Sequence, residues 1–348
     1  MPCNILAIDG GGIRGIVPAT IIQRIEKETG KKITDFFDVL AGTSTGGIIA
    51  AALAAGVNSS ELVALYLGKA KTIFKQSFLD RLTGIDEYLE ADYNNKGFKK
   101  ELDRILGTIS MKNVNESAAF GKKNKHLMVC SFDLNPEATT DGNRNYRPDV
   151  FYSSYLRDAS KTLVDICLMT SAAPTYFPIY NDHIDGGVAM NNPSMAAVAF
   201  ALNKQVSANA VYRLPDADNN GGFRKGLGLL SEEISLLSLG TGTSNRTFIP
   251  VEQTRKSNWG KLKWVNYLPD LLTESNVQST HYYVDQVLPE KNYIRWNPCF
   301  DVDDAPWVLK SDAIKLDETD PLKLHAMSDF AAAYYQKNKA PLLKLIGA

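Results

Sequence analysis

The chain reads Phe37-Asp-Val-Leu-Ala-Gly-Thr-Ser-Thr-Gly-Gly-Ile-Ile-Ala50 at the point that decides its fold. An apolar run stops at small residues and an alanine-rich helical pattern follows, which predicts a strand, a sharp turn and a helix. Ser44 stands at the apex, where such a Gly-x-Ser-x-Gly turn strains the backbone and exposes the hydroxyl at the sheet edge. Gly42 and Gly46 are required because side chains there would collide with neighbouring elements. The structural alternative is a tight glycine turn around a buried serine.

A second glycine turn, Asp9-Gly-Gly-Gly-Ile-Arg-Gly15, joins a buried strand at residues 4–8 to a helix at residues 18–30. The amide groups of such a loop are not covered by side chains, so they can converge on an anion. We therefore expect Gly10, Gly11 and Gly12 to form an anion-binding loop.

Two functions compete for this loop. Gly10 to Gly15 fits the Gly-x-Gly-x-x-Gly pattern of dinucleotide sites, which suggests a nucleotide-binding regulatory module. That site also requires an acidic residue about 20 positions further on, at the end of a second strand. Glu26 and Glu28 lie inside the helix instead. The nearby serine turn favours an oxyanion hole, with the Gly11 and Gly12 amides facing Ser44.

A serine hydroxyl needs a base because it is a weak nucleophile at its ordinary pKa. Histidine is the usual base, and the sequence contains His126, His183, His281 and His325. None of the four lies in a motif that presents it at a sheet edge. Asp185 is the better candidate, since it ends a short strand and is followed by Gly186 and Gly187, where the chain must turn tightly. A turn-capping aspartate is the structural alternative.

A carboxylate is a weak base toward a hydroxyl, so a Ser44–Asp185 dyad depends on strong stabilisation of the oxyanion. The loss of one oxyanion donor costs on the order of 3 kcal/mol. The Gly10–Gly12 loop is the anion site that such a dyad requires. Asp185 would accept the serine proton during acylation and activate water during deacylation.

The rest of the chain predicts an α/β fold. Strands are expected at residues 126–134, 150–152, 234–240 and 293–296, a buried helix at 162–173, a helix at 195–202 with Ser194 as its N-cap, and a mobile surface loop at 203–230. No clean boundary divides the 348 residues. We expect one catalytic domain over residues 1–348, with a core at about 4–245 and a helical C-terminal part at about 258–348.

The composition of the chain limits which partners, cofactors and cellular locations we expect. A net charge of −1 gives no field that would attract nucleic acid. The four cysteines are scattered without a Cys-x-x-Cys pair, so we expect reduced thiols, no metal site and no cofactor. The N-terminus lacks a secretory signal, and the uncharged residues 39–57 divide into strand, turn and helix rather than a membrane span. We expect a soluble, cytoplasmic protein with peripheral membrane contact.

Two groups of side chains are candidates for meeting lipid, the first at anionic head groups and the second at the mouth of a pocket, although a solvated helix face and core packing are the simpler interpretations. The first is a basic stretch that contains Lys96, Lys99, Lys100, Arg104, Lys112, Lys122, Lys123 and Lys125. The second is a set of aromatic residues: Phe74, Phe78, Tyr176, Phe177, Trp259 and Trp264.

The three glycine turns occur in an order that is similar to that of a known protein family. Asp9-Gly-Gly-Gly-Ile-Arg-Gly15, Gly42-Thr-Ser-Thr-Gly46 and Asp185-Gly-Gly187 each follow a strand, and the chain resembles the patatin-like phospholipases, relatives of the cytosolic phospholipases of the A type. Ser171-Ala-Ala-Pro-Thr-Tyr-Phe-Pro178 and Leu236-Leu-Ser-Leu-Gly-Thr-Gly242 add to the resemblance, which covers residues 4–245 well and the tail loosely.

The resemblance implies a three-layer α/β/α sandwich with a central mixed, mostly parallel sheet. It implies that Ser44 is the nucleophile, that Asp185 is its acidic partner without a histidine, and that Gly10 to Gly12 form the oxyanion loop with Arg14 beside it. Family members hydrolyse acyl esters of phospholipids and galactolipids without a metal. An acyltransferase or thioesterase on the same scaffold remains the alternative.

Overall fold

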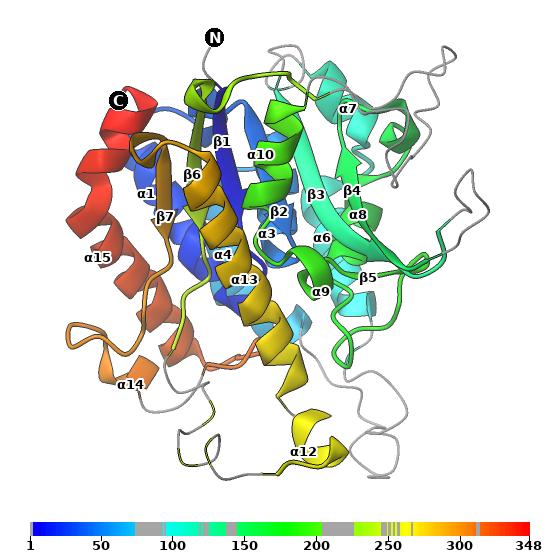
Figure 1. The fold of residues 1–348 in the computed structure, drawn as a ribbon, viewed down its shortest axis with the longest axis vertical. Coiled ribbons are helices and arrows are strands. Elements are labelled where there is room, and N and C mark those ends of the chain that lie inside the picture. Colours follow the sequence, from blue (N-terminus) through cyan, green and yellow to red (C-terminus); the bar gives the residue numbers. More distant parts are fainter. Residues whose placement is uncertain are drawn as a thin grey trace.

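A mixed sheet lies at the centre of the molecule (Figure 1). The computed structural model describes residues 3–73, 93, 95–117, 120, 125–136, 145–203, 226–244, 249, 252, 255, 258–265, 267–310 and 314–348. Within these residues the strand order is β4-β3-β2-β1-β6-β7, and β5 pairs with β3 outside this path. The strands are β1 (Cys3–Ile8), β2 (Val39–Thr43), β3 (His126–Asp133), β4 (Arg147–Tyr152), β5 (His183–Asp185), β6 (Ile234–Leu239) and β7 (Tyr293–Trp296).

The sheet is mostly parallel. β1 lies parallel to both β2 and β6, and the parallel arrangement continues to β3 on one side and β7 on the other. β4 and β5 run antiparallel to β3. The carboxyl ends of the parallel strands therefore meet along one edge, which is where α/β proteins place their sites.

Helices cover both faces of the sheet and complete three layers, which confirms the expected fold class. Leu6 and Ile8 of β1 belong to one hydrophobic cluster, whereas Ile5 and Ala7 belong to a second, because successive strand residues point to opposite faces. The first cluster includes residues of α1 (Ile16–Thr29), α3 (Thr45–Ala54), α4 (Ser59–Ile73), α8 (Leu163–Thr170) and α15 (Pro321–Ile346). The second includes residues of α10 (Ser194–Leu202) and α13 (Leu268–Val287).

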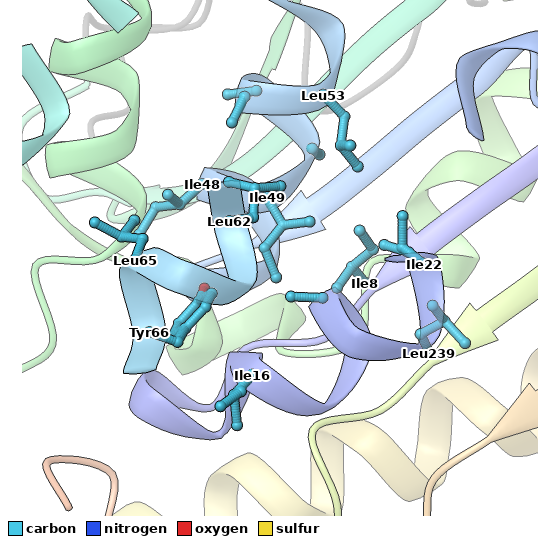
Figure 2. Packing of buried hydrophobic residues seen from close by; sticks show 14 of the residues in the cluster. Ile8, Ile16, Ile22, Ile48, Ile49, Leu53, Leu62, Leu65, Tyr66 and Leu239 are labelled. Atoms are coloured by element: carbon cyan, nitrogen blue, oxygen red, sulfur yellow. The ribbon is translucent and has the colours of Figure 1, made fainter. Parts of the chain in front are cut away.

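Packing in the first cluster fixes the two glycine turns relative to each other. Figure 2 shows Ile8 of β1, Ile22 of α1 and Ile49 of α3 among the buried side chains of this cluster. Each fully buried aliphatic side chain contributes about 1.5–3 kcal/mol. Because α1 and α3 start directly after the glycine turns, this packing holds both turns at the same sheet edge.

The predicted elements are largely confirmed, with one error. β7 matches its predicted range, and Gly30 ends α1 in the left-handed conformation expected of a glycine cap (φ 67°). The prediction of Ser194 as an N-cap is wrong. Ser194 is the first residue of α10 and Pro193 is the N-cap, without a side-chain cap hydrogen bond. The Asn192 side chain accepts a hydrogen bond from Ser194 N (2.9 Å), while Ser194 Oγ donates to Ser238 Oγ (2.8 Å) of β6.

The C-terminal part adds to the same sheet and to the first helical layer. β7 pairs with β6, and Ser328 of α15 is hydrogen-bonded to Thr20 of α1 (3.0 Å between the hydroxyl oxygens). No helix among the described residues is long and apolar enough to cross a lipid bilayer. The other α-helices in the described part of the chain are α2 (Ile33–Phe36), α6 (Asn95–Leu106), α7 (Met111–Glu116), α9 (Gly187–Met190), α12 (Lys261–Val265) and α14 (Trp307–Lys310).

Some predictions fall outside the described residues: Phe74, Phe78, Lys122, Lys123 and most of the loop at 203–230. Of the remaining residues in the basic and aromatic groups, Lys99 is paired with Asp103 one turn away on α6 (3.0 Å). Phe177 is buried and its ring packs against Phe98, as a core residue would. Trp264 is exposed and its ring contacts Trp259.

Candidate active site

Ser44 occupies a sharp turn between β2 and α3. Its backbone has φ 53° and ψ −124°, an uncommon conformation for a residue with a side chain. The flanking glycines leave no room for any substituent: a Cβ atom built on Gly42 would lie 2.2 Å from Gly46 O, and one built on Gly46 would lie 2.1 Å from Ile8 O. The sequence prediction of a strained turn with sterically required glycines is confirmed.

Asp185 is brought to Ser44 by the sheet. β5 pairs antiparallel with β3, with Asp185 opposite Ser131, and β3 lies beside β2. Ser44 Oγ donates a hydrogen bond to Asp185 Oδ2 (2.6 Å), and Gly187 N donates to Asp185 Oδ1 (2.7 Å). Both side chains are buried, with Ser44 8% and Asp185 7% exposed. Hydrogen bonds to both carboxylate oxygens therefore fix the orientation of Asp185, with Oδ2 facing the serine hydroxyl.

Thr170, the last residue of α8, connects the two halves of this pair. Its Oγ1 accepts a hydrogen bond from Ser44 N (2.8 Å), and its backbone oxygen accepts one from Gly186 N (3.1 Å). A Cβ atom on Gly186 would lie 2.3 Å from Cys130 O of β3, so the turn after Asp185 needs glycine for steric reasons.

The environment tunes Asp185 toward base chemistry. Burial raises the pKa of Asp185 to about 6, although hydrogen bonds from Ser44 and Gly187 act to lower it. A carboxylate with this pKa is a stronger base than an exposed one and is still ionised at neutral pH. A base is most effective when its pKa lies near the working pH.

Within the described chain, none of the four histidines is hydrogen-bonded to Ser44 or Asp185. His183 Nε2 lies 3.3 Å from Asp149 Oδ2, and its Nδ1 lies 2.6 Å from Asn181 O. His281 Nδ1 lies 2.9 Å from Tyr293 Oη. Burial lowers the pKa of His126. The aspartate is thus the base that the geometry offers to the serine.

The glycine loop lies directly beside Ser44. A Cβ atom built on Gly10 would lie 3.2 Å from Ser44 Cβ. The Gly10 amide already donates to Asn191 O (2.9 Å), whereas the amides of Gly11 and Gly12 donate to no acceptor in the part of the chain that the structure describes. Gly11 (φ 158°) and Gly12 (φ 57°) both have positive φ angles. Two of the three predicted donors therefore remain available for an anion.

Arg14 and Gly15 support this loop. The Arg14 amide donates to Gly11 O (3.2 Å), and its Nε lies 3.5 Å from the same oxygen. The Arg14 side chain thus braces the carbonyl side of the loop. A Cβ atom on Gly15 would lie 2.2 Å from Thr45 Oγ1, which packs this turn tightly against the start of α3.

A buried ion pair behind the loop was not predicted from the sequence. Arg295 of β7 forms two hydrogen bonds to Asp9, from Nη1 to Oδ1 (2.9 Å) and from Nη2 to Oδ2 (2.5 Å). Arg295 Nη1 also donates to Ser238 Oγ (2.8 Å). Asp9 is 2% exposed and directly precedes the three glycines. The available signal was a charged residue in each of two otherwise apolar strand regions.

One cluster of potential metal ligands occurs among the described residues, and it includes His183 of β5 but neither member of the dyad. Side-chain atoms of Asp133, Asp149 and His183 lie within 4.8 Å of one another. Arg157 Nη1 donates to Asp149 Oδ1 (2.7 Å), so a cation here would compete with an existing positive charge. Burial opposes ionisation of Asp149, but His183 and Arg157 outweigh it and lower its pKa. We assign no ion to this cluster.

With the geometry established, comparison with known proteins identifies the family. Residues 6–198 match the model of the family described as patatin-like phospholipase. The chain belongs to the patatin-like phospholipase family. Its relatives include patatin-like protein 4 of Arabidopsis thaliana, which is 28% identical, with the alignment covering 96% of this chain and 84% of the relative.

This patatin-like chain is also similar to a second plant relative and to a solved bacterial structure. Patatin-like protein 2 of Arabidopsis thaliana is 29% identical, with 84% of this chain and 74% of the relative covered. The crystal structure of VipD from Legionella pneumophila aligns with a TM-score of 0.40 and 13% identity, covering 95% of this chain and 67% of VipD.

Proposed function

We propose that this patatin-like chain is a serine acyl hydrolase that cleaves fatty-acyl esters of phospholipids or related membrane lipids. Family membership supports lipid acyl hydrolase activity. The observation that carries the mechanism is the 2.6 Å hydrogen bond from Ser44 Oγ to Asp185 Oδ2, beside two glycine amides with no acceptor among the described residues. A nucleophile of this kind attacks an acyl carbon, so the cleavage is of the A type.

In the acylation step, Asp185 accepts the Ser44 proton while Oγ attacks the carbonyl carbon of the lipid ester. The negative charge that develops on the carbonyl oxygen is stabilised by the Gly11 and Gly12 amides. The amino terminus of α3 adds a favourable dipole at Ser44. Collapse of the tetrahedral intermediate expels the lipid alcohol, which takes the proton from Asp185, and leaves an acyl ester on Ser44.

In the deacylation step, Asp185 accepts a proton from water while the water oxygen attacks the acyl carbon. The bond from that carbon to Ser44 Oγ then breaks, and the proton passes from Asp185 to Ser44. The fatty acid is released and the dyad is restored. No metal or cofactor takes part in this scheme.

Covalent labelling combined with product analysis tests the proposal. A fluorophosphonate probe should label one residue, and peptide mapping should place the label on Ser44. Incubation with phosphatidylcholine vesicles should release free fatty acid and lysophospholipid, detected by mass spectrometry. Phosphoalcohol products would indicate cleavage at the phosphate, and transfer of the acyl group to added glycerol or thiol would indicate an acyltransferase. Either result without fatty acid release would overturn the hydrolase proposal.

We further propose that the region around α12 and the start of α13 contacts the membrane surface. Asn276 of α13 accepts a hydrogen bond from Asn192 N (3.3 Å) and donates to Ala189 O, so α13 passes beside α9 and the dyad. From Asn276 to Leu268 the helix extends about 12 Å further. This end of α13 and α12 project from the body of the molecule (Figure 1, yellow).

This projecting region has the composition of an interfacial segment. Leu268, Leu271 and Leu272 are exposed on α13, at spacings that place them on one helix face. Trp264 of α12 is 42% exposed, and Lys263 Nζ lies 4.4 Å above the Trp259 ring. Exposed leucine and tryptophan beside lysine are typical of helices that lie at a lipid surface.

We expect Leu268→Asp/Leu272→Asp to reduce binding to vesicles of phosphatidylcholine and phosphatidylglycerol by about tenfold or more, because both leucines would leave the lipid interface. Cosedimentation measures the binding. Hydrolysis of a soluble ester should not change. The matched control is Leu230→Asp, which alters an exposed leucine that precedes β6 at the opposite sheet edge. Equal binding by the two variants would contradict the assignment of this surface.

A further inference from the structure

The side chain of Asn191 lies close to both members of the dyad. A Cβ atom built on Gly10 would lie 2.2 Å from Asn191 Oδ1 and 3.2 Å from Ser44 Cβ. A Cβ atom built on Gly187 would lie 2.9 Å from Asn191 Oδ1 and 3.0 Å from Asp185 Oδ1. The carboxamide of Asn191 is therefore within a few ångströms of both the nucleophile and the base.

The backbone around Asn191 is fixed from three directions. Asn191 O accepts the Gly10 amide (2.9 Å), and the preceding carbonyl, Met190 O, accepts a hydrogen bond from Thr43 Oγ1 (2.6 Å). Asn276 of α13 binds the same turn through Ala189 O and Asn192 N. On the side of the turn, these contacts involve only main-chain atoms of residues 189–192. They therefore position the Asn191 side chain without forming a hydrogen bond to it.

The side chain itself has no hydrogen-bond partner within the residues that the structure describes, although it is only 6% exposed. Neither polar atom of the Asn191 carboxamide is among the fully buried side-chain atoms that lack a partner, so a water molecule or a substrate atom can reach the group. Buried polar groups in proteins are nearly always satisfied in this way.

We propose that Asn191 is a catalytic residue that binds the hydrolytic water during deacylation. The inference rests on the proposed function. In the acyl-enzyme, Ser44 Oγ is an ester oxygen and no longer donates to Asp185, so Asp185 Oδ2 can accept one water proton. Asn191 Oδ1 accepts the second O–H of the same water. The water oxygen then presents a lone pair to the acyl carbon.

The step is balanced. A bond forms between the water oxygen and the acyl carbon, the bond from that carbon to Ser44 Oγ breaks, and the proton taken by Asp185 returns to Ser44. Asn191 neither gains nor loses a proton. Acylation does not use this water, so the two half-reactions should respond differently to the loss of the carboxamide.

The test compares Asn191→Leu with wild type on a soluble p-nitrophenyl ester. Leucine has about the same volume but no hydrogen-bonding group. We expect labelling of Ser44 by fluorophosphonate to stay within about threefold of wild type. Steady-state turnover should fall by about ten- to a hundredfold, because the water loses its orientation. A rapid initial release of one p-nitrophenol per enzyme molecule should appear. Mass spectrometry of the intact protein should show the acyl group attached to it.

Three further variants make the result specific. Asn191→Ala gives a second way to remove the carboxamide if leucine perturbs folding. Asn191→Asp retains an acceptor oxygen and should deacylate faster than Asn191→Leu. Asn192→Ala is the matched control, since the Asn192 side chain accepts from Ser194 N (2.9 Å), and it should lower the melting temperature without an acyl burst.

Parallel loss of labelling and turnover in the Asn191 variants would overturn the proposal and indicate an oxyanion or structural role. Unchanged turnover would overturn it as well. If wild type itself showed neither labelling of Ser44 nor ester turnover, the proposed function would fail, which is a separate and earlier outcome.

Discussion

Ser44→Ala and Asp185→Asn should each lower ester hydrolysis by at least about a thousandfold while the protein stays folded. Alanine removes the nucleophile, and asparagine removes the base but keeps the size and hydrogen-bonding capacity of the side chain. The Gly187 amide, which donates to Asp185 Oδ1 (2.7 Å), still finds an oxygen in the asparagine variant. Turnover of lipid and soluble esters measures the effect, and circular dichroism checks the fold.

The pH dependence separates a catalytic base from a merely structural aspartate. With the pKa of Asp185 raised to about 6 by burial, kcat/KM of wild type should fall as pH decreases through about 6. The residual activity of Asp185→Asn should lack this acid limb. Substantial turnover in Asp185→Asn with the wild-type pH profile would exclude Asp185 as the base.

The same pKa has a consequence for stability. Because burial raises the pKa of Asp185 above its ordinary value near 4, the folded state binds more protons than the unfolded state between about pH 4 and 6. The contribution of this group to the free energy of unfolding is therefore full at low pH and is lost as pH rises through about 6. Asp185→Asn should consequently gain stability relative to wild type at neutral pH.

Arg295→Leu should destabilise the protein by about 3–5 kcal/mol, since it leaves the buried Asp9 carboxylate without its cation. Arg295 forms two hydrogen bonds to Asp9, which directly precedes the Gly10–Gly12 loop. We therefore also expect slower fluorophosphonate labelling, because the loop loses its support. Urea denaturation measures the free energy of unfolding.

An exposed ion pair is the matched control for this variant. Lys337 Nζ lies 3.3 Å from Asp304 Oδ2, and the two side chains are 73% and 64% exposed. Lys337→Ala should cost less than about 1 kcal/mol, because solvent screens exposed pairs. If Arg295→Leu cost no more than Lys337→Ala, the ion pair at Asp9 would have no structural role behind the loop.

The sequence predicted those parts of the site that depend on local geometry. Ser44 and Asp185 each follow an apolar strand and precede a glycine turn, and strand ends in an α/β fold converge on one edge. The local sequence pattern was therefore enough to predict that the two residues lie close together. It also sufficed to name the Gly10–Gly12 loop, although the use of the Gly10 amide by Asn191 O depends on a turn about 180 residues away.

The contacts that the sequence did not predict join elements distant in the chain. Arg295 reaches Asp9 only because β6 lies between β1 and β7 in the sheet order. Asn191 lies near the dyad because Gly10, Thr43 and Asn276 of α13 together fix its turn. The error at Ser194 has the same origin: a nearby hydroxyl on β6 competes with the local capping position. Tertiary contacts decide such cases, and one sequence does not contain them.

The link through Thr170 has a further consequence for how activity is lost under stress. One residue at the end of α8 accepts hydrogen bonds from Ser44 N and Gly186 N. Local opening of that helix end would release Ser44 and the turn after Asp185 in a single event. A population of partly opened molecules should therefore be a mixture of fully competent and wholly silent enzymes rather than a uniform set of slower ones.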